Sequence, residues 1–219
     1  VADGMGGHKG GDTAAGIVKE ELPRYIRENH QSDATGQLLV RAVKHVNEVI
    51  YREARNNEEI NDMGTTVTAL LVKGDTAFIA NVGDSRCYLY GQEQIFQVSR
   101  DHTLLQEKIR LGMTPRHQAL EDDPMANALV RTVGYEENVL VDIFRYKYLE
   151  QQIFLLCSDG LYNKLSDRDL VNFISGHLPR NLASVSESDL EGLGKAMVAT
   201  ANERGGQDNI SLIFAVICR

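Results

Sequence analysis

The stretch TTVTALLVKGDTAFIANVGDSRCYLYGQEQIFQV, residues 65–98, decides the fold class. Its short segments rich in β-branched and aromatic residues predict strands over 65–72, 76–82, 87–90 and 94–98. Lys-Gly-Asp, Gly-Asp-Ser and Gly-Gln-Glu separate these segments, and such residues are typical of tight turns. The stretch therefore predicts an antiparallel meander.

Helices are expected on both sides of this meander. Before it, apolar residues at helical spacing predict helices over 14–28, with a kink at Pro23, and over 38–55. After it we expect a helix over 104–111, a polar loop over 112–127, strands over 139–146 and 152–157, helices over 167–174 and 188–203, and a final strand over 210–217. Strands in hairpins with helices grouped between them predict an α+β fold and not a doubly wound parallel sheet.

The composition is that of a globular protein. The 219 residues are 42% hydrophobic and 25% charged, and a chain of this length buries roughly 70% of its unfolded surface. We therefore expect residues 1–219 to form a single domain. The net charge of −8, without a cluster of lysine and arginine, argues against a nucleic-acid partner. The longest apolar run, residues 212–218, is too short to span a membrane.

The cysteines indicate the compartment. Cys87, Cys157 and Cys218 lack the spacing of a metal site, and two of them lie inside apolar runs. Such cysteines are typical of a reducing compartment. We therefore expect a cytoplasmic protein.

Four aspartates each stand at one end of a predicted strand, beside a glycine or a turn: Asp3 and Asp159 follow their strands, Asp84 lies in a hairpin bend, and Asp208 precedes its strand. Any one of them alone is usually a turn or cap residue, because aspartate is rare inside strands. In antiparallel neighbours, however, the end of one strand lies beside the start of the next, so all of them can reach one rim of the sheets. Converging carboxylates repel one another unless protons or cations compensate. Oxygen ligands without cysteine favour Mg²⁺ or Mn²⁺, and Gly4 lets its backbone carbonyl serve as a further ligand.

Other catalytic motifs are missing from the sequence. The run GMGGHKGGD, residues 4–12, fits neither the phosphate-binding P-loop nor the dinucleotide-binding pattern. No G-x-S-x-G elbow and no H-E-x-x-H motif occurs. Ser158 has no recognisable histidine partner, and Cys157 ends an apolar strand. Covalent catalysis therefore has no convincing candidate.

Motifs spread over nearly the whole chain carry a resemblance to a known family. In order they are VADGMGGH (1–8), MGTTVTAL (63–70), NVGDSRCYLY (81–90), LLCSDGLYNKLSD (155–167) and GGQDNISLI (205–213). Together they resemble the metal-dependent protein phosphatases of type 2C, the PPM family, and the Met-Gly-Gly of the first motif resembles its bacterial branch. The resemblance implies a layered α-β-β-α sandwich of two antiparallel sheets flanked by helices. It also implies a serine/threonine phosphatase whose substrates are proteins phosphorylated by a cognate kinase.

The resemblance further implies a site for two Mn²⁺ or Mg²⁺ ions. Asp3 would bridge the ions, the Gly4 carbonyl would join the first, and Asp159 and Asp208 would hold the second. Asp84 would share a third, weaker ion with Asp159. A metal-bound water would then attack phosphorus in line, without a phosphoenzyme.

Residues outside this ligand set are weaker candidates. Met5 stands where many eukaryotic members carry a histidine, and His8 lies close beyond it. We expect His8 either to donate a proton near pH 7 or to make a hydrogen bond at a helix entry. Arg86 and Arg131 are candidate phosphate-binding cations, or else partners of nearby acids.

Two further segments are expected near the site. Asp101-His102 is expected to belong to a turn. The loop over 112–127 resembles the variable flap of the family, which influences substrate access, and its alternative is a plain surface connection.

Two other classes of function compete with the phosphatase. A phosphatase-like binding or regulatory module without activity usually lacks a metal ligand, whereas all the motif aspartates are present here. A metal-dependent nuclease is disfavoured by the net charge of −8.

The chain opens directly at the first motif, with Val1-Ala2-Asp3. The resemblance implies an upstream strand with an arginine that grips the substrate phosphate, together with acidic residues around the first metal. We therefore expect the N-terminal strands of the sheets to be missing from residues 1–219 and a strand edge to be exposed. Lower solubility and activity than in a chain extended upstream would follow.

Overall fold

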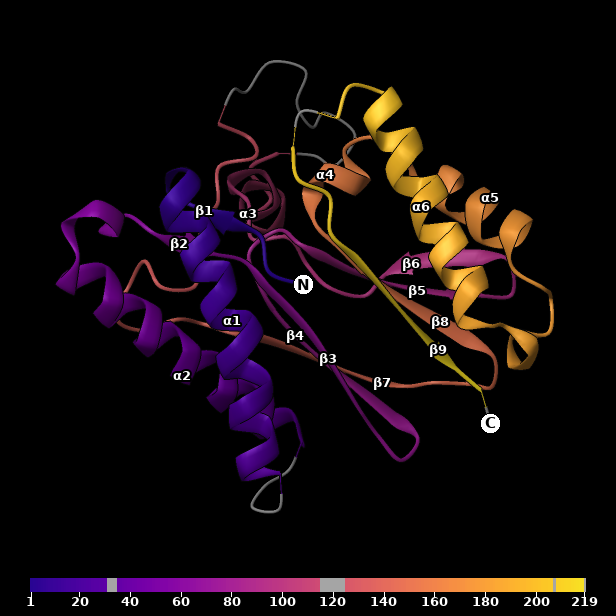
Figure 1. The fold of residues 1–219 in the computed structure, drawn as a ribbon, viewed down its shortest axis with the longest axis horizontal. Helices are drawn as coiled ribbons and strands as arrows, with labels where there is room; N and C mark the ends of the chain where they lie inside the picture. The colour runs from indigo at the N-terminus through magenta and orange to yellow at the C-terminus, as the bar shows by residue number, and fades with distance from the viewer. Residues whose placement is uncertain (31–34, 115–124, 207, 219) are drawn as a thin grey trace.

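The strands of this protein form two main antiparallel sheets. The computed structural model describes residues 1–30, 35–114, 125–206 and 208–218. Within them, a three-stranded sheet has the order β3-β4-β7, a four-stranded sheet has the order β6-β5-β8-β9, and β1 and β2 form a small pair (Figure 1). The strands are β1 (Gly4–Met5), β2 (Gly64–Thr65), β3 (Val67–Lys73), β4 (Thr76–Val82), β5 (Arg86–Gly91), β6 (Gln94–Gln97), β7 (Asp142–Lys147), β8 (Gln152–Cys157) and β9 (Leu212–Ile217).

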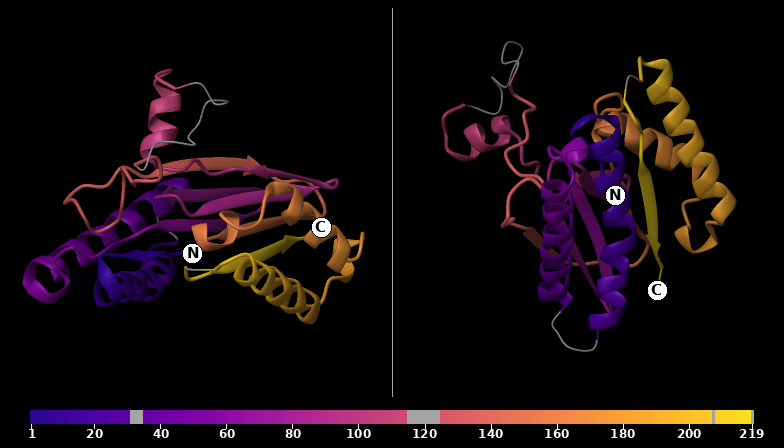
Figure 2. Two further views of the ribbon diagram at one scale, coloured as in Figure 1. Left: turned by 90° about the horizontal axis from the view of Figure 1, so that it is seen from above. Right: turned by 60° about the vertical axis from the view of Figure 1, so that its left-hand side comes forward.

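Helices accompany each sheet, which confirms the predicted α+β class. They are α1 (Gly7–Asn29), α2 (Thr35–Asn56), α3 (Leu104–Arg110), α4 (Asp159–Tyr162), α5 (Asp167–His177) and α6 (Glu187–Glu203), with short 3₁₀ helices at Glu58–Ile60 and Leu182–Ser184. Figure 2 shows α3 standing clear of the sheets, and none of its side chains is buried. None of the helices in the described part of the chain is long and apolar enough to cross a lipid bilayer.

Apolar side chains collect in three clusters. The first joins α1 and α2 to β3 and β4, and the second joins α5 and α6 to β5, β8 and β9. The third brings Ile79 of the three-stranded sheet together with Leu89 and Phe154 of the four-stranded sheet. Helices thus pack against each main sheet, and the two sheets pack against each other.

The predicted meander is wrong at one point, because β4 and β5 do not pair with each other. β4 pairs with β3 and β7, whereas β5 pairs with β6 and β8. The chain therefore passes from one sheet to the other through residues 83–85. Gly83 has a φ of 98° there, a conformation that glycine adopts without steric cost. The pattern of the sequence could not predict this crossing, because most positions of β4 and β5 are buried and show no alternation.

Helices α1 and α4 also differ from the prediction. Helix α1 begins at Gly7 and continues through Pro23 to Asn29, although its glycine-rich start has low helix propensity. The four-residue helix α4, which begins at Asp159, was not predicted because one turn has no periodic signal.

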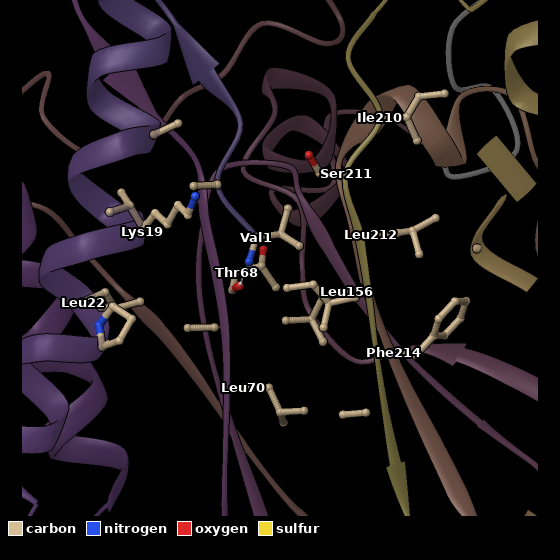
Figure 3. Close-up of a pocket in the computed structure, with 18 of the residues that line it drawn as sticks. Val1, Lys19, Leu22, Thr68, Leu70, Leu156, Ile210, Ser211, Leu212 and Phe214 are labelled. Atoms are coloured by element: carbon tan, nitrogen blue, oxygen red, sulfur yellow. Dashed lines mark hydrogen bonds between the residues drawn. The ribbon is translucent and has the colours of Figure 1, made fainter. Parts of the chain in front are cut away.

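A groove of about 1700 Å³ lies between the two main sheets at their edges β3 and β9. Figure 3 shows apolar side chains from both edges, among them Leu70 and Phe214, on its walls. Val1 exchanges backbone hydrogen bonds with Thr68 at one end, with N···O distances of 2.8 and 2.9 Å. Beyond Thr68, no strand of the described ranges pairs with this side of β3. In the described part of the chain, β3 and β9 are thus edge strands of their sheets.

Asn47 of α2 forms hydrogen bonds with a loop that is distant from it in the sequence. It is 1% exposed, and its amide nitrogen donates to the carbonyl oxygens of Glu136 and Glu137 at 3.0 and 3.1 Å. Its amide oxygen accepts from the backbone N–H of Gly134 at 2.7 Å. The neighbouring Val133 pairs with Thr65, so Asn47 supports the backbone that lies beside the second sequence motif.

Replacing Asn47 by Ala should lower the free energy of unfolding by about 2–4 kcal/mol, because it leaves buried backbone groups without partners. At roughly 2–4 °C per kcal/mol, this loss is readily measured as a lower Tm. Asn56→Ala, at the exposed end of the same helix, is the matched control and should change the Tm little. Equal melting of Asn47→Ala and wild type would contradict this role.

Candidate functional site

The predicted aspartates gather at one end of the sheets. Asp84 lies in the crossing before β5, Asp159 follows β8 after Ser158 and begins α4, and Asp208 precedes β9. β8 pairs with both β5 and β9, in registers that place its end beside the starts of these strands. In Figure 1, α4 and β1 lie at this same end.

Asp3 is held at this end by its backbone. Its N–H donates to Oγ1 of Thr66 at 3.0 Å, and its carbonyl oxygen accepts from the N–H of Thr66 at 2.9 Å. Oγ1 of Thr65 donates to the same carbonyl at 3.0 Å. These bonds fix Asp3 at the junction of β2 and β3.

Negative charge accumulates between these side chains. Burial, together with the charges of Asp159, Asp208 and Asp84, raises the pKa of Asp3 to about 7. Burial also raises the pKa of Asp84 to about 6, helped by Asp159 and Asp101. The pKa of Asp159 is raised by burial and by the charge of Asp208. The negative charges of these carboxylates therefore repel one another, and that of Asp84 is offset in part by the nearby charge of Arg86.

The chemistry of these donors suits a hard divalent cation. Oδ1 of Asp159 is buried and has no hydrogen-bond partner among the described residues, whereas its Oδ2 accepts from Nδ2 of Asn163 at 3.2 Å. A buried oxygen without a partner is costly unless a proton or cation meets it. In the described ranges, no group of three histidine, cysteine or acidic side chains is arranged to hold a metal ion as it stands. The donor types fit such an ion, and their positions would have to tighten around it.

Small residues let the chain segments of the site approach closely. A Cβ added to Gly4 would lie 2.0 Å from the carbonyl oxygen of Gly11, and one added to Gly160 would lie 2.4 Å from that of Asn209. Ser158 binds Ser211 at this point, because its hydroxyl accepts from the N–H of Ser211 at 3.0 Å. The contact of Gly160 thus brings the segments of Asp159 and Asp208 together, and Ser158 helps to fasten them.

Arg86 lies beside the site but is fully engaged with its neighbours. Its guanidinium group donates to both carboxylate oxygens of Asp101 at 2.6–3.1 Å and to the hydroxyl of Tyr88 at 2.9 Å. It also stacks over the ring of Tyr162, 3.6 Å from the centroid. Of the two expectations for Arg86, the structure contains the pairing with a nearby acid.

Arg131 is paired in the same way. Its Nη1 donates to Oδ1 of Asp142 at 2.9 Å, and the buried His102 lies 3.3 Å from the other carboxylate oxygen. Burial lowers the pKa of His102. Nδ1 of His102 accepts from the N–H of Gly83 at 3.1 Å, so this histidine supports the crossing that carries Asp84. The sequence predicted a turn at His102, and this contact was not predicted.

The remaining candidates are His8, the flap segment and Cys157. The backbone of His8 lies in the first turn of α1, but its side chain falls outside what the structure describes. Most of the flap candidate, residues 115–124, lies outside the described ranges as well. Cys157 is fully buried, and burial raises its pKa to about 12, so it is a poor nucleophile.

Comparison with known proteins decides which family has this arrangement. Residues 1–197 match the family described as protein phosphatase 2C. The chain belongs to this family. It is similar to the serine/threonine phosphatase stp of Listeria innocua, with 32% identity over 217 residues that cover 98% of this chain and 82% of the relative.

Solved structures of protein phosphatase 2C type resemble the chain over almost its whole length. The serine/threonine phosphatase of S. agalactiae has a TM-score of 0.85 and 27% identity, and the match covers 100% of this chain and 86% of the other. The catalytic domain of the phosphatase PstP, in complex with two manganese ions, has a TM-score of 0.79 and 25% identity over 99% of this chain and 86% of its own. The expected family and activity are confirmed: this protein phosphatase 2C member is a serine/threonine phosphatase, a phosphoric monoester hydrolase.

Proposed function

We propose that this phosphatase hydrolyses phosphoserine and phosphothreonine in proteins with two Mn²⁺ or Mg²⁺ ions. In this proposal Asp3, the Gly4 carbonyl, Asp159 and Asp208 would hold the two ions. Asp84, together with Asp159, would contribute to the site of a third, weaker ion. The observation that carries the proposal is the buried Oδ1 of Asp159, which lacks a partner among the described residues and lies in a group of repelling carboxylates. The two manganese ions of the PstP complex support it by analogy.

In this proposal the ions and the residues of the chain have separate roles in the reaction. When bound, the ions supply positive charge that acidifies a water molecule and offsets the charge that builds up on the phosphoryl group. The pKa of Asp3 is raised to about 7. Its carboxyl group would lose its proton when a cation binds, because the cation takes the place of that proton. Met5 follows Gly4 directly, which leaves His8 as the proposed proton donor to the leaving group.

The substrate class, the cellular compartment and the domain organisation are also part of this proposal. Membership of a serine/threonine phosphatase family favours phosphoproteins as substrates, and we propose that a cognate kinase produces them. The cysteines are free, which supports a reducing compartment such as the cytoplasm. We also propose that residues 1–219 act as one catalytic domain.

Removal of divalent ions should abolish hydrolysis of p-nitrophenyl phosphate, because the repelling carboxylates cannot activate water without them. Addition of Mn²⁺ should restore the rate, and isothermal titration should show two tight sites and a weaker one. A phosphatase-like module without activity would bind no pair of ions. Full activity in the presence of a chelator would contradict the proposal.

A further inference from the structure

A buried hydroxyl group connects the backbone of Asp3 to the crossing that carries Asp84. It belongs to Thr66, which lies between β2 and β3 and is 3% exposed. Oγ1 of Thr66 accepts from the N–H of Asp3 at 3.0 Å. The same oxygen lies 2.7 Å from Oγ of the fully buried Ser85, in a hydrogen bond that either hydroxyl can donate.

The crossing is held tightly against Thr66 on both sides of Asp84. A Cβ added to Gly83 would lie 2.6 Å from Cγ2 of Thr66, so the methyl group of Thr66 packs directly on that glycine. Ser85 is also fastened by its carbonyl oxygen, which accepts from Oγ1 of Thr68 at 2.8 Å. The residues that flank Asp84 therefore cannot shift without disturbing the contacts of Thr66.

We propose that Thr66 is a positioning residue whose hydroxyl group sets the spacing between Asp3 and Asp84. This inference rests on the proposed function, in which both aspartates face divalent ions. Thr66 itself contacts no ion or substrate. It acts through the backbone N–H of Asp3 and through Ser85, and both groups lose a partner when the hydroxyl is removed.

Two substitutions separate the contribution of the hydroxyl group of Thr66 from that of its methyl group. T66V keeps the shape of the side chain and removes the hydroxyl, so the packing on Gly83 persists while two buried polar groups are left unpaired. T66S keeps the hydroxyl and removes the methyl group. The two variants together assign any effect to hydrogen bonding or to packing.

The test is titration of the metal-free full chain with Mn²⁺ by isothermal calorimetry, well below the Tm of each variant. T66V should bind Mn²⁺ about 10–100-fold more weakly than wild type, as expected when a group that orients ligands is lost. T66S should bind close to wild type. The rate of p-nitrophenyl phosphate hydrolysis by T66V should recover at high Mn²⁺, so that the Mn²⁺ requirement changes more than kcat.

Wild-type Mn²⁺ affinity in T66V, or equal losses in T66V and T66S, would overturn the inference. If T66V does not fold, S85A removes the same hydroxyl–hydroxyl bond from the other side and leaves the methyl contact intact. S85A should then weaken Mn²⁺ binding in the same direction, and unchanged binding overturns the inference. Failure of the wild-type chain to bind Mn²⁺ at all would instead contradict the proposed function, so the two failures are distinguishable.

Discussion

Replacing Asp159 by Asn should abolish Mn²⁺-stimulated hydrolysis and, at neutral pH, stabilise the metal-free protein. In the proposed site Asp159 is a ligand, and its Oδ1 is buried without a partner among the described residues. Loss of its charge should lower kcat/KM for p-nitrophenyl phosphate by at least about 10²–10³-fold, the usual cost of removing one stabilising group from an active site. Asp208→Asn should have an effect of the same kind.

The gain in stability follows from the sign of the pKa shift. Burial and the charge of Asp208 raise the pKa of Asp159, so the folded state binds the proton of this carboxyl group more tightly than the unfolded state does. The folded state therefore loses stability as the pH rises through the raised pKa. Asparagine carries no charge, so the variant escapes this loss and should have a higher Tm at neutral pH without metal.

Asp75→Asn is the matched control for this variant. Asp75 lies between β3 and β4, at the opposite end of β4 from the site. A hydrogen bond from Thr76 and the charge of Lys147 lower its pKa, so its replacement should leave activity unchanged and give no gain in Tm. Full Mn²⁺-stimulated activity in Asp159→Asn would disprove the ligand assignment.

Replacing Gly4 by Ala should disrupt both stability and activity. The added Cβ would lie 2.0 Å from the carbonyl oxygen and 2.3 Å from the carbonyl carbon of Gly11. Backbone atoms cannot rotate away, so the start of α1 must move away from β1. Overpacking of this kind typically costs about 1–3 kcal/mol, and it displaces Asp3 together with Gly4.

Gly16→Ala provides the control within the same helix, because a Cβ at Gly16 meets nothing within 4 Å. It should leave activity unchanged and raise the free energy of unfolding by up to about 1 kcal/mol, since alanine favours the helix. Thermal melting and Mn²⁺-stimulated rates measure both variants. A Gly4→Ala protein with the Tm and rate of wild type would show that the close approach to Gly11 does not hold the site.

The local elements of this protein could be predicted because their signals are local. Helix α2 buries a face of residues at helical spacing, such as Leu39, Val43 and Ile50, and that spacing is visible in the sequence. The hairpin of β3 and β4 turns at Gly74-Asp75, residues typical of tight turns. The start of α1 was missed because its glycines favour a loop, whereas contacts with segments distant in the sequence, such as β1 and β2, stabilise the helix there.

The grouping of the aspartates also followed from the sequence, by the rule that antiparallel strands place ends beside starts. The pairing of Arg86 with Asp101 and of Arg131 with Asp142 did not. Both pairs join segments whose approach depends on how the two sheets are arranged. The sequence was therefore compatible with either role for each arginine, a phosphate-binding cation or the partner of a nearby acid.

The sequence by itself determined the fold class, the family and the aspartates that gather at one end of the sheets, because motif order and strand periodicity are properties of the chain. Only the tertiary structure decided that the chain changes sheets at Gly83. It alone revealed that the hydroxyl of Thr66 joins Asp3 to this crossing. These features depend on the packing of segments that are distant in the sequence, and the burial of a hydrogen bond between them leaves no periodic signal.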